Sequence, residues 1–204
     1  MAHERIEADF LLGAAQASQF PATGAPEVAM IGRSNVGKSS LINLLLRNGV
    51  VARVSSTPGK TQEINFFATS LGLTIADLPG YGYASVSKER RAEFATLINA
   101  YLQRRKELRV TFVLIDARHD PMPLDMAMLE QLEFGGRRFV AVLTKCDKLS
   151  EREVASRVEQ IRGLLSSCTH AVDVVPTSAT TSMGREALIG IMKRSREFPE
   201  YQPV

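Results

Sequence analysis

The segment GRSNVGKSS, residues 32–40, has the residue types and spacing of a loop that binds phosphate groups. It matches the pattern G-x-x-x-x-G-K-S/T through Gly32, Gly37, Lys38 and Ser39. The glycines let the backbone curl so that its N–H groups face an anion, and a following helix adds its positive N-terminal end. Lys38 would supply a positive charge to the outer phosphates, and the Ser39 hydroxyl a ligand for Mg²⁺. The phosphate-binding residues predicted here are Gly32, Arg33, Ser34, Asn35, Val36, Gly37, Lys38, Ser39 and Ser40.

An acidic motif, DLPG at residues 77–80, follows the apolar run LTIA. An aspartate at the end of a strand beside a phosphate loop can hold Mg²⁺ through a water molecule, so we expect Asp77 to face the metal. The backbone N–H of Gly80 could sense a γ-phosphate, and residues 80–83 would form a loop that responds to it. Because Asp-x-x-Gly is also a common turn, this interpretation depends on the phosphate loop. The predicted contacts from this motif are Asp77, Leu78, Pro79 and Gly80.

A third motif, TKCD at residues 144–147, has the residues to recognise guanine. The Asp147 carboxylate can accept hydrogen bonds from N1–H and the exocyclic amine of guanine, whereas adenine offers neither donor and would leave the carboxylate unpaired. Lys145 would lie along the face of the base. In PTSA, 31 residues further on, the backbone N–H groups of Ser178 and Ala179 suit the guanine O6. The predicted base contacts are Thr144, Lys145, Cys146, Asp147, Thr177, Ser178 and Ala179.

Residues 50–63 show neither helical nor strand periodicity and lie between two of these motifs. A segment that senses the nucleotide needs a threonine whose hydroxyl reaches Mg²⁺ only when a third phosphate is present. Thr57 precedes Pro58 and resembles a turn residue, whereas Thr61 lies just before the next strand. The residues alone leave the choice between these two threonines open.

The elements that would position the motifs follow from alternating apolar and amphipathic segments. Strands are expected at 27–32, 64–70, 71–78, 110–117, 139–145 and 171–179, and helices at 37–49, 87–108, 123–134, 150–167 and 182–198. This alternation predicts an α/β fold of the P-loop NTPase, small-GTPase-like type, with a doubly wound, mostly parallel six-stranded sheet and helices on both faces. The hairpin at 64–78 would add one antiparallel edge strand. In such sheets ligands bind outside the carboxyl ends of the strands, where all the motifs fall.

Length and composition are those of one globular domain: 204 residues, 45% hydrophobic and 23% charged, with a formal net charge of +3. We expect an N-terminal extension at 1–25, a nucleotide-binding domain at 26–198 and a C-terminal tail at 199–204. Two cysteines without a C-x-x-C pair and three scattered histidines argue against a disulfide framework or a zinc site. With neither a signal-peptide pattern nor a membrane-spanning apolar run, the sequence predicts a soluble cytoplasmic protein without a membrane partner.

The motifs together resemble those of the EngB (YihA/YsxC) family of bacterial ribosome-biogenesis GTP-binding proteins. The matching segments are GRSNVGKSSLIN, TPGKTQ, INFF, DLPGYGYA, DARHDPMPLD and TKCDKL. The resemblance implies a compact GTPase domain, a role in assembly of the large ribosomal subunit, and a requirement for normal growth and septum formation. It also implies that Thr61 is the magnesium threonine, with Gly59 and Lys60 beside the nucleotide. The chain departs from the family pattern at Met122–Pro123, where a threonine is expected after the proline of HDP.

The expected reaction is hydrolysis of GTP to GDP and phosphate. We expect Lys38, Thr61 and Gly80 to act on the phosphates. The expected Mg²⁺ ligands are Ser39, Thr61 and, through water, Asp77.

A glutamine that orients the attacking water follows Asp-x-x-Gly in many GTPases, but this chain has Tyr81 there. Because a phenol with a pKa of about 10 is a poor base, we expect slow intrinsic hydrolysis that a partner or K⁺ stimulates. Asn35 resembles a potassium-coordinating asparagine of related GTPases, although it could equally form hydrogen bonds within its own loop.

Basic residues form several clusters that could contact a polyanion. They are Lys88, Arg90 and Arg91; Arg104, Arg105, Lys106 and Arg109; Arg137 and Arg138; and Lys193, Arg194 and Arg196. Any RNA contact would be directed mainly at phosphates and would be sensitive to salt. The expected partner is the large ribosomal subunit or its precursor, rRNA and ribosomal proteins included, and the protein is expected to be a monomer. Two alternatives are a regulatory module of cell division with incidental GTPase activity and a GTPase subunit of an RNA-modifying enzyme, which 204 residues leave little room for.

Overall fold

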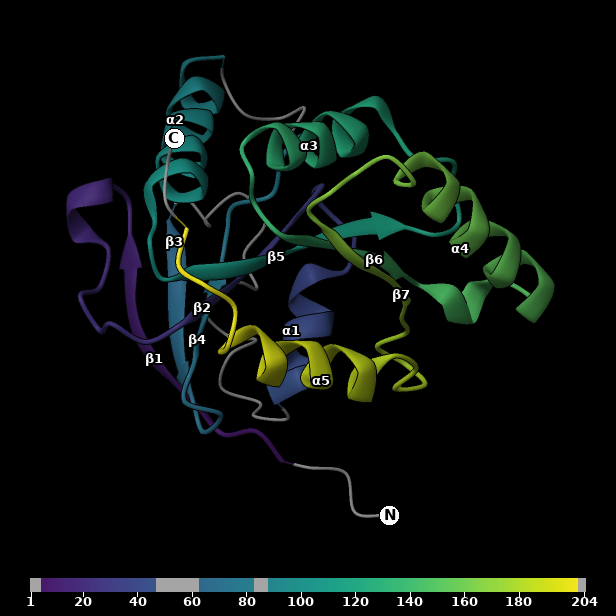
Figure 1. The fold of residues 1–204 in the computed structure, drawn as a ribbon, viewed down its shortest axis with the longest axis horizontal. Helices are drawn as coiled ribbons and strands as arrows, with labels where there is room; N and C mark the ends of the chain where they lie inside the picture. The colour runs from purple at the N-terminus through teal and green to yellow at the C-terminus, as the bar shows by residue number, and fades with distance from the viewer. Residues whose placement is uncertain (1–4, 47–62, 83–87, 202–204) are drawn as a thin grey trace.

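The structure, a computed structural model, describes residues 5–46, 63–82 and 88–201. Its strands form one sheet in the order β1-β3-β4-β2-β5-β6-β7, with helices on both faces (Figure 1). The strands are β1 (Ala8–Ala14), β2 (Glu27–Gly32), β3 (Ile64–Thr69), β4 (Thr74–Asp77), β5 (Leu108–Asp116), β6 (Phe139–Thr144) and β7 (Ala171–Pro176). The helices are α1 (Lys38–Leu46), α2 (Lys88–Arg104), α3 (Pro123–Phe134), α4 (Glu151–Leu164) and α5 (Arg185–Ser195), with short 3₁₀ turns η1 (Ala17–Gln19) and η3 (Cys146–Lys148).

The sheet confirms the predicted fold class but has one more strand than expected. Strands β4, β2, β5, β6 and β7 are parallel, and β3 runs antiparallel to both of its neighbours. The seventh strand, β1, comes from the segment expected to be an N-terminal extension, and it pairs with β3 from Ala8↔Thr69 to Ala14↔Ile64. The antiparallel strand therefore lies one place in from the edge, because β1 covers backbone groups that would otherwise be unpaired.

The ends of the elements differ from the predicted ends for local reasons. Helix α5 begins at Arg185 rather than 182, after Gly184, which has a φ of +75°. A Cβ atom on Gly184 would lie 2.2 Å from the carbonyl oxygen of Pro176, so the end of β7 leaves no space for a side chain there. Helix α3 has its predicted bounds, since Pro123 suits the first helical position and the Asp125 carboxylate accepts a backbone N–H at the helix start at 3.3 Å.

Two hydrophobic layers enclose the sheet and hold its loops in place. Helices α2, α3 and α4 cover one face, and α1 and α5 cover the other (Figure 1). In β5, Val113 and Ile115 face the first layer, whereas Phe112 and Leu114 face the second, and all four are buried. A strand buried on both faces explains the near-continuous apolar run in this part of the sequence.

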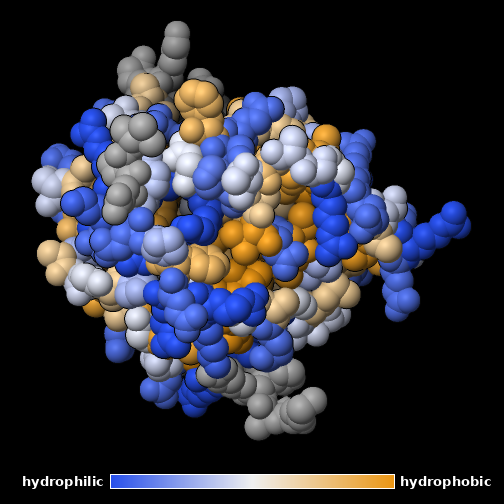
Figure 2. Space-filling model, in the orientation of Figure 1, coloured by the Kyte–Doolittle hydropathy of each residue, from blue (hydrophilic) through white to orange (hydrophobic). Residues whose placement is uncertain are grey.

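The surface is largely hydrophilic in the same view, with hydrophobic residues visible mainly near its centre (Figure 2). Within the described ranges, no helix is both long enough and apolar enough to traverse a lipid bilayer. Cys146 and Cys168 are free thiols, the first of them buried.

Candidate nucleotide-binding site

The predicted motifs meet at one edge of the sheet. The phosphate loop follows β2, DLPG follows β4, TKCD follows β6 and PTSA follows β7. Because these four strands are parallel, all of these loops leave the carboxyl edge of the sheet. This is the edge at which doubly wound sheets bind ligands.

The phosphate loop has the backbone that its glycines predict. Asn35 and Gly37 have positive φ angles of 64° and 106°, which turn the chain between β2 and α1. A Cβ on Gly32 would lie 2.9 Å from the carbonyl oxygen of Leu114, so the loop leaves the sheet too close to β5 for a side chain. The first N–H groups of α1 have no acceptor within the helix. The loop and the positive end of the helix together suit a phosphate group.

Lys38 and Asp77 form an ion pair across this loop. The ammonium of Lys38 is hydrogen-bonded to Asp77 Oδ1, and the two side chains are only 12% and 4% exposed. Asp77 is positioned by its pairing with Met30 on the neighbouring strand, so it lies beside the loop that β2 enters. A bound nucleotide would draw Lys38 to phosphate oxygens and free the Asp77 carboxylate for a cation.

Oxygen donors for Mg²⁺ gather at the same place. Ser39 follows Lys38 in the first turn of α1, and Asp77 lies against Lys38. Hydroxyl and carboxylate oxygens with phosphate are the ligands that Mg²⁺ prefers. The described part of the chain contains no group of three or more His, Cys, Asp or Glu that could hold a metal ion. Thr61, Gly59 and Lys60, also predicted here, lie outside the described residues, as does Tyr83.

The DLPG segment is packed tightly beneath the phosphate loop. Leu78 is fully buried in the core, so its side chain faces away from the nucleotide site, and its N–H donates to the Met30 carbonyl at 3.0 Å. Pro79 and Gly80 are also buried. Leu78, predicted as a nucleotide contact, therefore has only backbone atoms to offer.

Three atoms of Tyr81 form hydrogen bonds to other residues of the protein. Its N–H donates to the Gly32 carbonyl at 3.2 Å, and its carbonyl accepts the Ser34 N–H at 3.1 Å. Its hydroxyl donates to Asp125 Oδ1 at 2.9 Å. Burial, and after it the charge of Asp125, raises the pKa of the phenol well above its ordinary value. Tyr81 is therefore a neutral hydrogen-bond donor and not a base for the attacking water.

Asp125 is a residue to which the sequence analysis assigned no role. It is 2% exposed, and besides Tyr81 it faces Arg33 of the phosphate loop, whose Nη1 lies 3.9 Å from Oδ2. Burial raises the pKa of Asp125, although the hydrogen bond from Tyr81 opposes the shift. The sequence signal was present in the segment DARHDPMPLD, but only the fold shows that its last aspartate joins α3 to two nucleotide loops.

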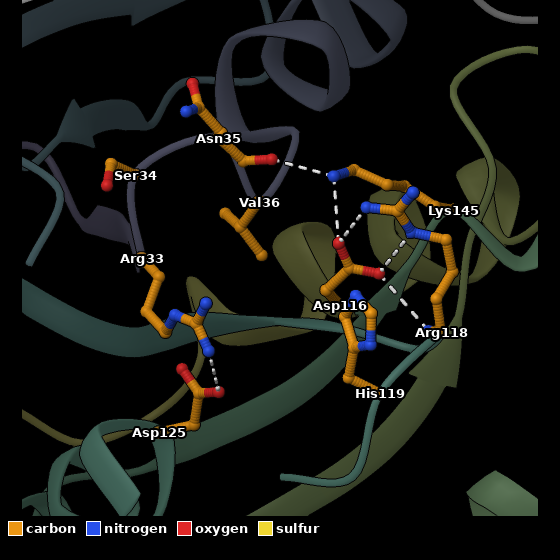
Figure 3. Close-up of a pocket in the computed structure, with 9 residues that line it drawn as sticks. All are labelled: Arg33, Ser34, Asn35, Val36, Asp116, Arg118, His119, Asp125 and Lys145. Carbon is orange, nitrogen blue, oxygen red and sulfur yellow. Dashed lines mark hydrogen bonds and ion pairs between the residues drawn. The ribbon is translucent and has the colours of Figure 1, made fainter. Parts of the chain in front are cut away.

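Lys145 connects the base-recognition loop to the phosphate loop. It adopts a left-handed backbone with φ 60°, and its ammonium donates to the Asn35 carbonyl at 2.7 Å and to Asp116 Oδ2 at 2.8 Å (Figure 3). Partial burial disfavours the ionised form of Asp116. Hydrogen bonds from Arg118 and Lys145 together have the larger effect and hold the pKa of Asp116 below the usual range. These side chains line a cleft of about 360 Å³ between the phosphate loop and α3, together with His119 (Figure 3).

The residues predicted to recognise guanine also lie together, and the backbone N–H of Ser178 differs from its expected orientation. Ser178 Oγ donates to Asp147 Oδ1 at 2.7 Å, which lowers the pKa of that carboxyl and orients it. The Ser178 N–H, expected to face guanine O6, instead donates to the Met183 carbonyl at 3.2 Å, because the chain turns sharply toward α5. Ser178 thus acts through its hydroxyl, and the N–H suited to O6 is that of Ala179. A hollow of about 140 Å³ lies here, lined by Asp147, Ala179 and Lys145 among others.

The remaining predicted residues shape this loop. Thr144 Oγ1 donates to the Val36 carbonyl at 2.7 Å, which joins β6 to the phosphate loop. The Thr177 hydroxyl donates to the Leu143 carbonyl at 2.8 Å, so it faces into the sheet. The Cys146 thiol is buried, and burial raises its pKa, so it contributes no reactive group. These three side chains are engaged within the protein and stabilise the loop that carries Lys145 and Asp147.

Comparison with known proteins accords with this arrangement. A family model described as a 50S ribosome-binding GTPase matches residues 27–145. The probable GTP-binding protein EngB of Heliobacterium modesticaldum is 43% identical over 186 residues, which cover 91% of this chain and 90% of the relative. That of Leuconostoc citreum is 42% identical over 180 residues, which cover 88% of this chain and 93% of the relative. The crystal structure of a probable GTP-binding protein engB has the same fold, with a TM-score of 0.68 at 21% identity over 84% of this chain and 98% of that one. The chain is a GTPase and belongs to the EngB family of GTP-binding proteins.

Proposed function

We propose that this GTPase acts in assembly of the large ribosomal subunit and binds the subunit or its precursor according to the nucleotide it holds. The observation that carries the proposal is the match of residues 27–145 to a family described as 50S ribosome-binding GTPases. The described residues form one sheet with its covering helices, so the nucleotide would control a partner's binding rather than feed a second active site. The protein would act in the cytoplasm, and normal growth and septation would depend on it through the supply of ribosomes.

In this function the residues expected to lie near the phosphates have separate roles. Lys38 would leave Asp77 for the outer phosphates, and Gly80 would present its N–H to the γ-phosphate. Ser39, Thr61 and, through water, Asp77 would hold Mg²⁺, which when bound neutralises charge on the phosphate oxygens. The ion pair between Lys38 and Asp77 supports this scheme, because it shows that both groups reach the same point.

We also propose that intrinsic hydrolysis is slow and that a partner or K⁺ stimulates it. The Tyr81 hydroxyl donates to Asp125, so it supplies neither a base nor an orienting acceptor for water. The proposed K⁺ ligand is Asn35, whose side chain extends away from Lys145 and Asp116 while its carbonyl accepts a hydrogen bond from Lys145 (Figure 3). A cation here would neutralise charge as an arginine finger does.

The potassium proposal predicts a rate difference between matched salts. We expect single-turnover hydrolysis to be at least about tenfold faster in KCl than in NaCl, since charge neutralisation at the transferred phosphate is a large term. Asn35→Ala should remove that difference while GDP affinity stays within about threefold. Equal rates of the wild-type protein in the two salts would contradict the proposal.

Co-sedimentation with isolated large ribosomal subunits tests the main proposal. The full chain is centrifuged with subunits in a non-hydrolysable GTP analogue, in GDP and without nucleotide, each at two salt concentrations. We expect pelleting chiefly with the GTP analogue and less at high salt. Asp147→Asn serves as a control, because it should pellet poorly with the GTP analogue. A protein that holds nucleotide but pellets in none of the three states would overturn the ribosomal function and favour a partner in cell division.

A further inference from the structure

A cluster of arginines lies at the amino edge of the sheet, opposite the nucleotide site. We call Arg109, Arg137 and Arg138 the arginine pole. Arg109 is the second residue of β5, and Arg137 and Arg138 immediately precede β6. Arg137 Nη1 donates to the carbonyl of Arg105 at 3.1 Å, which holds Arg137 against the residue that follows α2.

Two of these arginines carry buried donors that have no acceptor. Arg137 is 4% exposed and Arg109 is 8% exposed. Among the described residues, Arg137 Nε and Nη2 and Arg109 Nε are buried and make no hydrogen bond. Burial lowers the pKa of Arg137 to about 10, only partly opposed by nearby tyrosines. Because buried donors in proteins are nearly always satisfied, unpaired guanidinium groups in one cluster call for an explanation.

The last described residues of the chain cover the arginine pole. After α5 the chain runs toward α2 (Figure 1), and the Tyr201 ring stacks on Arg137 with 3.3 Å between the ring centroid and Cζ. The Phe198 ring lies 5.2 Å from Arg138. Glu200, whose side chain is 64% exposed, pairs with Arg109 Nη2 at 3.1 Å. An aromatic ring stabilises a cation, but it provides no lone pair to the N–H groups that lie in the guanidinium plane.

An oxyanion that faces several guanidinium groups would supply the missing acceptors. Arginine presents planar N–H forks that match carboxylate and phosphate oxygens in pairs. A single carboxylate, Glu200, reaches Arg109 Nη2 from an exposed position, and Arg109 Nε and the Nε and Nη2 atoms of Arg137 remain without an acceptor among the described residues. A chain of phosphates can satisfy several forks at once, and it is attracted by the summed charge of the cluster.

We propose that the arginine pole binds backbone phosphates of RNA and that residues 198–201 are a lid that RNA displaces. Displacement exchanges the Tyr201 stack and the Glu200 ion pair for phosphate oxygens on the unpaired N–H groups. This inference rests on the proposed function, which supplies an RNA-rich partner. The pole lies at the edge opposite the nucleotide, so RNA and GTP bind at separate places.

Fluorescence anisotropy with a labelled single-stranded RNA of about 20 nucleotides tests the proposal on the full chain. Tyr201→Ala and Glu200→Gln should each tighten RNA binding about threefold or more, whereas Tyr201→Phe, which keeps the ring, should match the wild type. Arg138→Ala should weaken binding and reduce the slope of log affinity against log salt by about one. The matched control is Arg152→Ala, which removes an exposed arginine of α4 and should change affinity by less than about twofold. Each variant is first shown to bind GDP as the wild type does, which confirms that it is folded.

Several results would overturn the inference. If the lid variants bound RNA with unchanged affinity, residues 198–201 would not act as a lid. If Arg138→Ala weakened RNA binding no more than Arg152→Ala does, the arginine pole would not be the RNA site. Millimolar inorganic phosphate that displaces RNA, where chloride of equal ionic strength does not, would identify a small-anion site instead. Polyglutamate that binds more tightly than RNA would identify an acidic protein partner. If the lid variants tighten RNA binding while no variant pellets with ribosomal subunits, the proposed function fails and the RNA site stands.

Discussion

The charged side chains at the two edges of the sheet differ in how they are paired. At the carboxyl edge, ion pairs join residues of different loops, as in Lys38 with Asp77 and Lys145 with Asp116. At the amino edge Arg137 is stacked on a ring and keeps unpaired donors. Side chains that pair with one another can exchange those partners for a nucleotide and its cation, whereas the arginine pole lacks acceptors that a ligand would bring.

The amino edge also contains a buried ionic network, centred on Glu27, that has a structural role. Glu27 is fully buried and accepts hydrogen bonds from the Tyr101 hydroxyl at 2.7 Å and from Arg105 Nη2 at 2.6 Å. Burial, followed by the nearby Glu27, raises the pKa of Tyr101 well above its usual value. Every charge in this network is satisfied, so unlike Arg137 it needs no further ligand.

The largest expected effect distinguishes the buried Glu27 network from the exposed ion pair of Glu200. Glu27→Ala should lower the free energy of unfolding by about 3–5 kcal/mol, because the buried Tyr101 hydroxyl loses its acceptor and Arg105 loses its most buried carboxylate partner. The control Glu200→Ala, which removes an exposed partner of Arg109, should cost no more than about 1 kcal/mol. Urea denaturation monitored by circular dichroism gives both values. Similar losses for the two variants would contradict the distinction between a structural network and a removable lid.

The next effect concerns recognition at the carboxyl edge. Asp147→Asn should weaken GTP binding by about a hundredfold or more, because two charge-assisted hydrogen bonds to guanine are lost. The variant should gain affinity for xanthosine triphosphate, whose base offers an oxygen where guanine has its amine. Isothermal titration calorimetry with both nucleotides measures the exchange. GTP affinity equal to that of the wild type would show that Asp147 does not read the base.

A smaller effect distinguishes a structural tyrosine from a catalytic one. Tyr81→Phe should lower the free energy of unfolding by about 1–2 kcal/mol, since the buried Asp125 loses a donor. Single-turnover hydrolysis should change by less than about threefold, because the hydroxyl is engaged with Asp125 and does not position water. Urea denaturation and quenched-flow hydrolysis provide the two readouts. A rate loss of a hundredfold with unchanged stability would place Tyr81 in the reaction instead.

The smallest expected effect is a dependence on pH. The pKa of Asp116 is lower in the folded protein, so its contribution to stability is present above about pH 4, the ordinary pKa of aspartate, and is lost as pH falls toward the lowered value. Since the site is partly solvent-exposed, the contribution should be about 1 kcal/mol or less. Asp116→Asn should flatten the acid side of the stability curve, measured by denaturation from pH 7 to pH 3. A variant that loses stability in acid as steeply as the wild type would assign that loss to other carboxyl groups.

The sequence by itself determined the features that depend on neighbouring residues. The phosphate loop is recognisable because glycines such as Gly37 adopt backbone angles that other residues resist, and α3 because Pro123 suits a helix start. Strand and helix alternation predicted the sheet, since burial on one or both faces leaves a periodic pattern in the residues.

Only the tertiary structure decided the contacts between distant segments. The pairing of β1 with β3 depends on an exposed edge some fifty residues further along the chain, and the weak apolar pattern of ADFLLGA does not reveal it. The bonds from Tyr81 to Asp125 and from Lys145 to Asp116 join residues 44 and 29 positions apart. The lid on the arginine pole brings Tyr201 to Arg137 from the other end of the domain. Such contacts cannot be predicted from local sequence propensity, because the packing of whole helices and strands determines which distant residues meet.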